Sequence, residues 1–253
     1  MIITDKQYFE QYESLIGNEL KSIVQNFDFS EKTSDLSYQT QASAVYSSNI
    51  EGNTIDLNSF MNYKLSQTTA KPQKELKEIE DLISAYSFAQ ESKLNEKNFL
   101  KAHHVLSKQF LIKSLRGKYR NDKVGVFGQS GLVYLAVEAE FVSREMSVLF
   151  EEISALLKAE LTLIGAFYFA SLIHLRIAHI HPFMDGNGRA ARLIEKWFLA
   201  QKLGSGYWKT PSEKYYKEQQ QQYYSNINLG VNYYELNYDK CLPFLAMLPK
   251  SLE

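Results

Sequence analysis

The chain has 253 residues, of which 45% are hydrophobic and 23% are charged, and its formal net charge is −1. This composition excludes a disordered chain, and the near-zero charge gives no general attraction to nucleic acid or to an anionic membrane. The single cysteine, Cys241, excludes an intramolecular disulfide framework. It is typical of a reducing compartment, so we expect a cytoplasmic protein. The first residues lack the apolar run of a signal peptide, and we expect no uninterrupted membrane span.

Most of the chain has the 3.6-residue period of amphipathic helices. A capping-box-like start at Thr4 and Gln7 predicts a first helix that runs to about Phe27. Its expected apolar face holds Tyr8, Tyr12, Leu15 and Ile16. Further helices are expected over 35–48, after Pro72 and over 95–111.

The helical pattern is interrupted between residues 116 and 142. Two β-prone runs, KVGVF and LVYLAV, flank GQSG at 128–131, which predicts a β-hairpin. Helical spacing returns over 143–161, 163–180 and 188–203 and continues weakly in the Tyr- and Gln-rich tail. The four glutamines at 219–222 are expected on a solvated helix face. We therefore predict an all-α fold, a helical bundle with one small β-hairpin.

The segment HIHPFMDGNGRAARL, residues 179–193, joins two of the most apolar predicted helices. Pro182 disfavours helix at the preceding residue, so the first helix should end near His179 or Ile180. The free N–H groups and the dipole at the start of the next helix favour an anion. Arg189 and Arg192 are three residues apart, so we expect both on one face of the first turn, where they can hold phosphate oxygens.

Other residues of this segment suggest phosphoryl chemistry. Asp185 is an acid beside the expected phosphate, which is how proteins usually hold Mg²⁺. His181 is the residue type whose pKa suits proton abstraction near neutral pH. Phe183 is expected to pin the loop to the core. Taken singly, a structural histidine and an ordinary glycine turn remain alternative interpretations.

Histidines elsewhere allow a different interpretation. A zinc site could be built from His174, His179 and His181, but the first two are five residues apart and lie off a common helix face. We therefore disfavour zinc. His103 and His104 are expected at a helix surface or interface.

Residues 181–192 resemble the signature of the Fic family, His-Pro-Phe-x-Asp/Glu-Gly-Asn-Gly-Arg-x-x-Arg, at every specified position. The helical region 75–204, with the hairpin at about 122–137, resembles the core and flap of that family. It is preceded by an N-terminal helical region, 1–74, and followed by a C-terminal helical extension, 205–253. The usual reaction of the family transfers AMP from ATP to a hydroxyl of a protein, and the resemblance implies this activity here.

The resemblance also assigns roles to single residues. His181 would take the proton from a target Ser, Thr or Tyr hydroxyl, and Asp185 would hold Mg²⁺ on the phosphates of ATP. Relatives that transfer a phosphate have a lysine where this chain has Gly188, so nucleotidyl transfer is favoured. The implied nucleotide-binding residues are Phe183, Gly186, Asn187, Gly188, Arg189 and Arg192, joined by Tyr223 and Tyr224 from a fainter likeness in the tail. The segment EKYYKEQ, 213–219, competes with those tyrosines for the same match.

A second pattern lies upstream, where Ser47-x-x-x-Glu51-Gly52 resembles the inhibitory motif of the family. On its own the pattern indicates a helix that ends at a glycine. The resemblance implies that Glu51 pairs with Arg192, so that ATP binds only in an unproductive pose. In some relatives the same glutamate supports the removal of AMP from the target, which leaves a deAMPylase as an alternative.

The expected partner is a protein substrate, the chain itself included. Val124 to Val137 would pair its backbone with an extended segment of the target. Many relatives have prolines just after the flap, where this chain has VEAEFV. We expect no nucleic-acid partner, and a homo-oligomer remains open. A nucleotide-binding regulatory module without transfer is the alternative outside enzymes, but a pure sensor has no need of His181 as a base.

Overall fold

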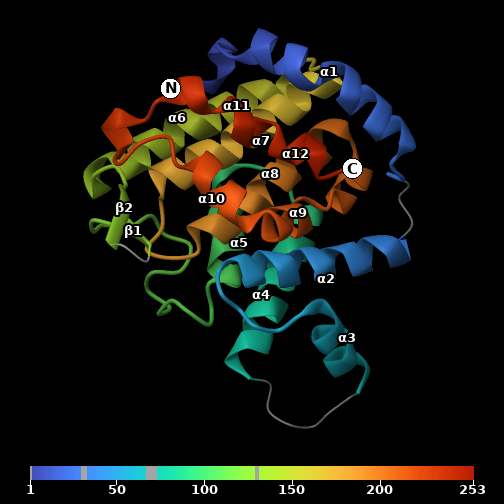
Figure 1. The fold of residues 1–253 in the computed structure, drawn as a ribbon. Helices are drawn as coiled ribbons and strands as arrows, with labels where there is room; N and C mark the ends of the chain where they lie inside the picture. The colour runs from blue at the N-terminus through green and yellow to red at the C-terminus, as the bar shows by residue number, and fades with distance from the viewer. Residues whose placement is uncertain (1, 30–32, 67–72, 129–130) are drawn as a thin grey trace.

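The computed structural model describes residues 2–29, 33–66, 73–128 and 131–253. Within these ranges the chain is mostly helical, as predicted, with a two-stranded antiparallel hairpin (Figure 1). The longer helices are α1 (Phe9–Asn26), α2 (Thr33–Ile50), α3 (Leu57–Leu65), α4 (Lys74–Gln90), α5 (Glu96–Leu106), α6 (Ala139–Lys158), α7 (Leu163–Ile180) and α8 (Asn187–Leu203).

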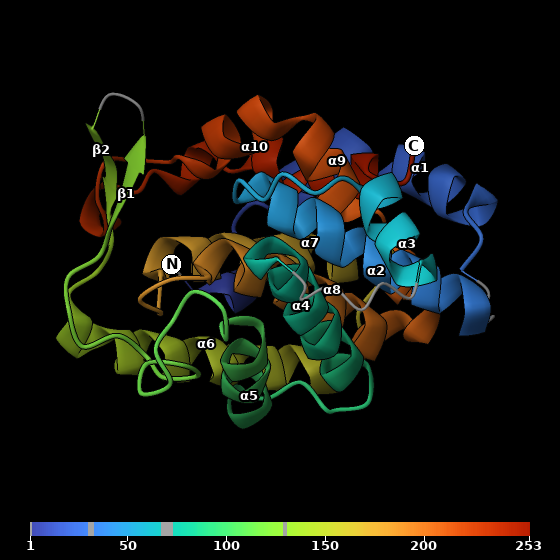
Figure 2. The ribbon, with the colours of Figure 1, turned by 90° about the horizontal axis from the view of Figure 1, so that it is seen from below.

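Two adjacent helices, α7 and α8, form the centre of the protein, and the other helices pack around them (Figures 1 and 2). By length and composition α7 could span a membrane, but 89% of it is buried inside the protein. Its core face includes Phe167, Leu172 and Ile177, all fully buried. Helix α8 is buried along most of its length, so the loop between α7 and α8 starts and ends on rigid elements.

The N-terminal region differs from the prediction at its first helix. Thr4 lies in a short 3-10 turn, and its backbone N–H and its hydroxyl both donate to Glu152 of α6 at 3.3 Å. The predicted capping box is therefore wrong, and α1 begins at Phe9 without a side-chain cap. Tyr12 and Ile16 are buried as predicted, but Leu15 is 56% exposed. Helix α3 was not predicted.

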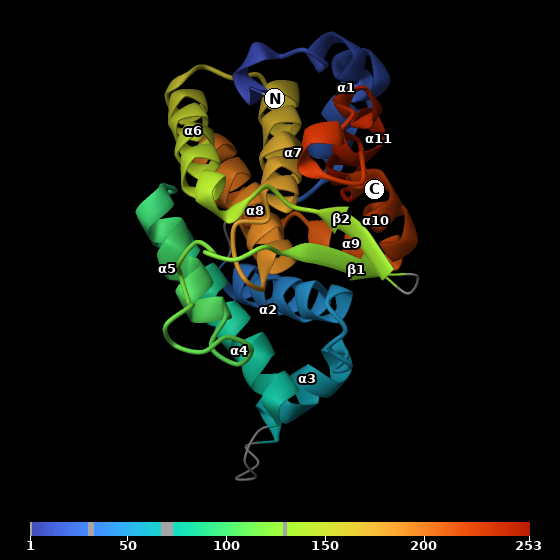
Figure 3. The same cartoon turned by 90° about the vertical axis from the view of Figure 1, so that its left-hand side faces the viewer.

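The hairpin lies where it was predicted. Strand β1 (Gly125–Gly128) pairs with β2 (Gly131–Leu135) in antiparallel register, with an irregularity between Val126 and Phe127. Residues 129 and 130 of the predicted turn lie outside the described residues. At its base, the N–H of Leu135 donates to Val231 O at 2.9 Å, so the C-terminal segment extends beside the hairpin (Figure 3).

The C-terminal extension folds back over the first helices. Helix α9 (Ser212–Glu218) packs on α2, and α10 (Gln220–Ile227) follows it directly. Short helices α11 (Leu242–Leu245) and α12 (Met247–Lys250) then pack on α1 and α7. The extension therefore closes the same core, and α2 lies between α4, α8 and α9.

Candidate active site

The loop between α7 and α8 has a strongly constrained backbone. His181 ends α7 in the left-handed region, with φ 52° and ψ 58°, and its N–H still bonds Ile177 O at 2.9 Å. Pro182 cannot donate to a continued helix, so the chain turns away at this point. Gly186, at φ 81°, precedes α8, and a side chain there would meet the ring of Phe110 at 3.0 Å. The helix boundaries predicted from Pro182 and the glycines are thus confirmed.

Asn187 and Phe183 hold this loop together. The Phe183 N–H donates to Asn187 Oδ1 at 2.8 Å, and Asn187 Nδ2 donates to Phe183 O at 2.9 Å. The loop therefore engages both ends of this buried amide, which holds the backbone of the turn in place. The Phe183 side chain is fully buried. It is the apolar pin that was also predicted.

His103 of α5 contacts the same loop and therefore lies at an interface, one of the two positions that were predicted for it. It is 1% exposed, and its ring stacks on Phe183 at 3.5 Å between centroids. Nδ1 accepts from the Gly117 N–H at 3.1 Å, so Nε2 carries the proton and donates to Asp185 O at 2.9 Å. Burial lowers the pKa of His103 to about 4, and the ring is neutral.

The His181 ring has the hydrogen bonding that a base requires. Its Nδ1 lies 3.2 Å from Ala178 O, a contact in which Nδ1 carries the proton. The other nitrogen, Nε2, is then the acceptor. The pKa of His181 is lowered to about 4, first by burial and in smaller part by the charge of Arg120, whereas the Ala178 hydrogen bond and the charge of Glu51 act in the opposite direction. The ring is therefore neutral near pH 7 and able to accept a proton.

Arg120 is a site residue that the sequence did not indicate. It is 3% exposed, and its Nε donates to His181 O at 2.8 Å. Its other donors reach Ile180 O, Asp122 O and Val137 O, and its N–H bonds Pro182 O at 2.9 Å. The carbonyls of residues 122 and 137 flank the hairpin. One buried guanidinium therefore joins the base of the flap to the residues around His181.

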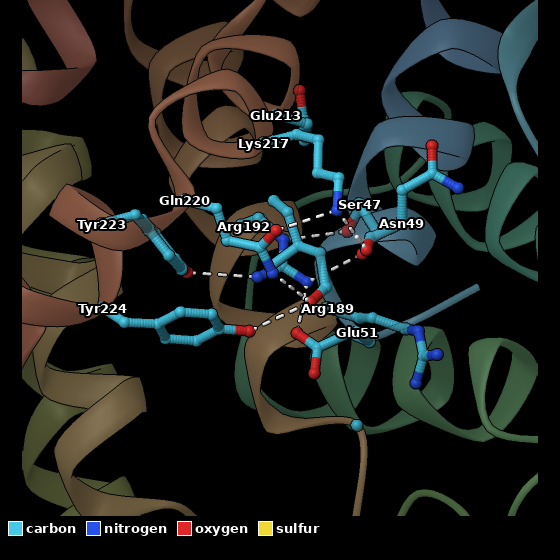
Figure 4. Close-up of polar contacts among 12 residues, drawn as sticks. Ser47, Asn49, Glu51, Arg189, Arg192, Glu213, Lys217, Gln220, Tyr223 and Tyr224 are labelled. Carbon is cyan, nitrogen blue, oxygen red and sulfur yellow. Dashed lines mark hydrogen bonds and ion pairs between the residues drawn. The ribbon is translucent and has the colours of Figure 1, made fainter. Parts of the chain in front are cut away.

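Arg192 lies at the centre of a buried polar network (Figure 4). Its Nη2 bonds Glu51 Oε1 at 2.7 Å, and its Nε bonds Ser47 Oγ at 2.9 Å. Nη2 also bonds Ser47 O at 3.0 Å, and Nη1 bonds the Tyr223 hydroxyl at 3.1 Å. The guanidinium is fully buried, so its charge is matched by protein groups alone.

Glu51 follows α2 directly, and Gly52 turns the chain in the left-handed region at φ 94°. Burial raises the pKa of Glu51, but the charges of Arg192 and Arg189 outweigh it and hold that pKa below its usual range. A Cβ on residue 188 would lie 2.3 Å from Glu51 Oε1. Because Gly188 has no side chain, the Glu51 carboxylate can lie against the first turn of α8. The N-terminal end of a helix favours an anion.

Arg189 and Arg192 diverge from their common turn. Arg189 Nη2 lies 3.5 Å from Glu78 Oε2 of α4, and its guanidinium stacks over Phe110 at 4.6 Å. Its Nε is buried and has no hydrogen-bond partner among the described residues. The two side chains therefore leave this turn in different directions, Arg192 toward Glu51 and Arg189 toward Glu78, and Arg189 retains an unused donor.

Asp185 is exposed at the same loop, and its Oδ1 accepts from the Gly186 N–H at 2.6 Å. Across the described residues, no set of three or more His, Cys, Asp or Glu is placed to hold a metal. The ring nitrogens of His174 bond Glu195 and Tyr223, and those of His179 bond Tyr238 and Ile227 O. These histidines are therefore parts of hydrogen-bond networks.

Tyr223 and Tyr224 sit beside Arg192. Tyr223 is 2% exposed and links Arg192 to His174, whereas Tyr224 is 46% exposed and its hydroxyl donates to Ile50 O at 3.0 Å. Tyr216, in the competing segment 213–219, is buried and bonds Glu195 instead. The structure thus brings residues 223 and 224, not 216, to the predicted site.

A cavity of about 540 Å³ joins these parts, a volume within the usual range for small-molecule sites. Its lining includes His181, Gly188, Arg192, Glu51, Tyr223, Tyr224, Ala178, Asn228 and flap residues such as Val126 and Phe127. The base, the first turn of α8, the glutamate and one edge of the flap therefore face one space.

Comparison with known proteins agrees with this geometry. Residues 93–199 match the model of the Fic/DOC family. The "Protein adenylyltransferase Fic" of Drosophila grimshawi is 40% identical over 62 residues, which are 24% of this chain and 12% of that protein. The protein of the same name from Culex quinquefasciatus is 26% identical over 189 residues, 73% of this chain and 36% of that protein. The chain thus matches only about a tenth to a third of the length of these relatives.

The crystal structure of a Fic family protein from Desulfovibrio desulfuricans G20 superposes with a TM-score of 0.76 at 22% identity. The match covers 95% of this chain and 71% of that one. The chain therefore has the Fic fold. Its residues 93–199 carry the match to the Fic/DOC family, and this segment holds His181, Arg189 and Arg192.

Proposed function

We propose that the chain is a protein adenylyltransferase that moves AMP from ATP to a Ser, Thr or Tyr hydroxyl and that Glu51 restrains it. One observation carries the proposal: His181 and the Glu51–Arg192 pair line the same cavity, which flap residues also line. A base and a restrained phosphate ligand in one space are what nucleotidyl transfer under inhibition requires.

The residues around the start of α8 are suited to a nucleoside triphosphate. The first turn of α8 lacks a side chain at Gly188, which leaves room for an anion, and Arg189 Nε is a buried donor without a partner among the described residues. Arg192 becomes a phosphate ligand once Glu51 leaves it. The exposed carboxylate of Asp185 beside this turn would hold Mg²⁺, which neutralises charge on the phosphate oxygens when bound.

In the transfer, the target hydroxyl oxygen attacks the α-phosphorus while its proton passes to His181 Nε2. The bond from the α-phosphorus to the bridging oxygen breaks, and pyrophosphate leaves with the electron pair. Arg120 and Pro182 fix the backbone of His181, so the neutral ring keeps its orientation during the step. The target docks on the flap through its backbone, and self-modification is included among the targets.

Glu51 restrains this reaction in two ways. It withdraws Arg192 from the outer phosphates, and it places a negative charge where a phosphate would lie, since it already fills the space at Gly188. Because its pKa is held below the usual range, the carboxylate stays ionised at neutral pH. The restraint therefore does not depend on protonation near pH 7.

The test compares ATP labelled at the α- or at the γ-phosphate, with Mg²⁺, in the wild-type protein, Glu51→Gly and Glu51→Gly/His181→Ala. Label from the α position alone should enter Glu51→Gly, and the loss of His181 should abolish it. Uptake of label from the γ position would indicate phosphate transfer and contradict AMP transfer. If no variant takes up label but the wild-type protein releases AMP from a modified target, removal of AMP is the activity.

A further inference from the structure

The end of α2 that carries Glu51 is held by side chains from the C-terminal extension. Lys217 Nζ donates to Asn49 O at 2.9 Å. Gln220 Nε2 and the Tyr224 hydroxyl both donate to Ile50 O at 3.0 Å. Figure 4 shows these side chains converging on the last turn of α2 from α9 and α10.

These contacts lie at the C-terminal end of α2, where the backbone carbonyls need partners from outside the helix. The last carbonyls of an α-helix have no partner within the helix and carry the negative end of its dipole. An ammonium group at that end is favourable, and Lys217 is oriented further by Gln220 Oε1 at 2.8 Å. Since Glu51 is the next residue after Ile50, fixing this turn also fixes the carboxylate against Arg192.

The Lys217 contact lies apart from the catalytic groups. Lys217 does not line the cavity that His181 and Arg192 share, whereas Tyr224 does. Tyr224 therefore connects the two regions: it lines the cavity, and its hydroxyl donates to Ile50 O.

We propose that Lys217, Gln220 and Tyr224 form a clamp that sets how firmly Glu51 closes the phosphate site, which makes the C-terminal extension a regulatory element. This inference rests on the proposed function, because it concerns the restraint on AMP transfer. Any partner or ligand that shifts α9 and α10 away from α2 would release Glu51 without touching the catalytic loop.

The test is a double-mutant cycle that measures the rate of self-modification with α-labelled ATP. Lys217→Met keeps the aliphatic stem and removes the charge, and Lys214→Met on the same helix is the control, since Lys214 pairs with Glu218. Loss of one partly exposed charge-assisted hydrogen bond should raise the rate about three- to tenfold. In the Glu51→Gly background, Lys217→Met should leave the rate unchanged, because the group it restrains is absent.

The outcomes separate the clamp from the proposed function. If Glu51→Gly transfers AMP but Lys217→Met lowers the rate, or changes it equally in both backgrounds, the clamp is wrong and the function stands. If Glu51→Gly does not transfer AMP, the function fails, and hydrogen exchange of peptides covering 43–55 tests the clamp. Faster exchange in Lys217→Met than in Lys214→Met supports it, and equal exchange overturns it.

Discussion

Replacing Arg120 by methionine should both destabilise the protein and change the acid limit of its activity. The guanidinium satisfies carbonyls on both sides of the flap and around His181, and its contacts with Val137 O and Ile180 O are buried. A buried acceptor without a partner costs about 1–3 kcal/mol, so losing at least two, partly offset by removing a buried charge, should lower the free energy of unfolding by about 2–4 kcal/mol. Arg116→Met is the matched control, since the partners of the Arg116 side chain among the described residues are two carbonyls nearby in sequence, Leu111 O and Lys108 O.

The effect of Arg120→Met on activity follows from the loss of the positive charge near His181. Burial and then the charge of Arg120 lower the pKa of His181, so without Arg120 that pKa should rise toward its ordinary value of 6.5. The base works only when neutral, so the acid limb of the transfer rate should move to higher pH. Both profiles are measured in the Glu51→Gly background, which removes the opposing charge, and urea unfolding gives the stability. An unmoved acid limb together with a stability equal to that of Arg116→Met would refute this role.

Two further predictions concern stability. Burial lowers the pKa of His103 to about 4 and that of His179 to about 3, so the unfolded chain binds more protons below pH 6.5 and stability must fall as the pH falls through this window. At pH 5 each of these two histidines should lower the free energy of unfolding by on the order of 2 kcal/mol, which is measured as a lower urea midpoint. His103→Gln should make the dependence of stability on pH less steep. A wild-type stability that does not change with pH would contradict this prediction. Gly188→Ala places a Cβ 2.3 Å from Glu51 Oε1 and should lower the free energy of unfolding by about 1–3 kcal/mol. The cost should shrink in the Glu51→Gly background, and an equal cost in both would show that the carboxylate is not what fills that space.

Local patterns predicted the parts of this fold that local chemistry decides. Pro182 and Gly186 set the end of α7 and the start of α8, because backbone restrictions act on the residue itself or its neighbour. Gly52 stops α2 for the same reason. The hairpin followed from two β-prone runs around a turn.

Contacts between distant segments could not be predicted in this way. Arg120 is an arginine in a polar stretch, and only the folded chain shows that its partners are carbonyls beside His181. For His103 the sequence left a helix surface and an interface open, because its burial depends on the ring of Phe183, which lies on a distant segment of the chain. Gln220 was expected on a solvated face, yet it bonds Ile50 O. Thr4 bonds Glu152 of α6 in preference to capping its own helix.

The measurement that tests the account most directly is the initial rate of AMP incorporation into the purified protein at saturating ATP and Mg²⁺, for the wild type and Glu51→Gly. The pair between Glu51 and Arg192, 2.7 Å apart, should keep the wild-type rate low. We expect Glu51→Gly to be at least about tenfold faster, as the loss of a buried charge-assisted contact requires. Equal rates in the two proteins would contradict the claim that Glu51 restrains the site.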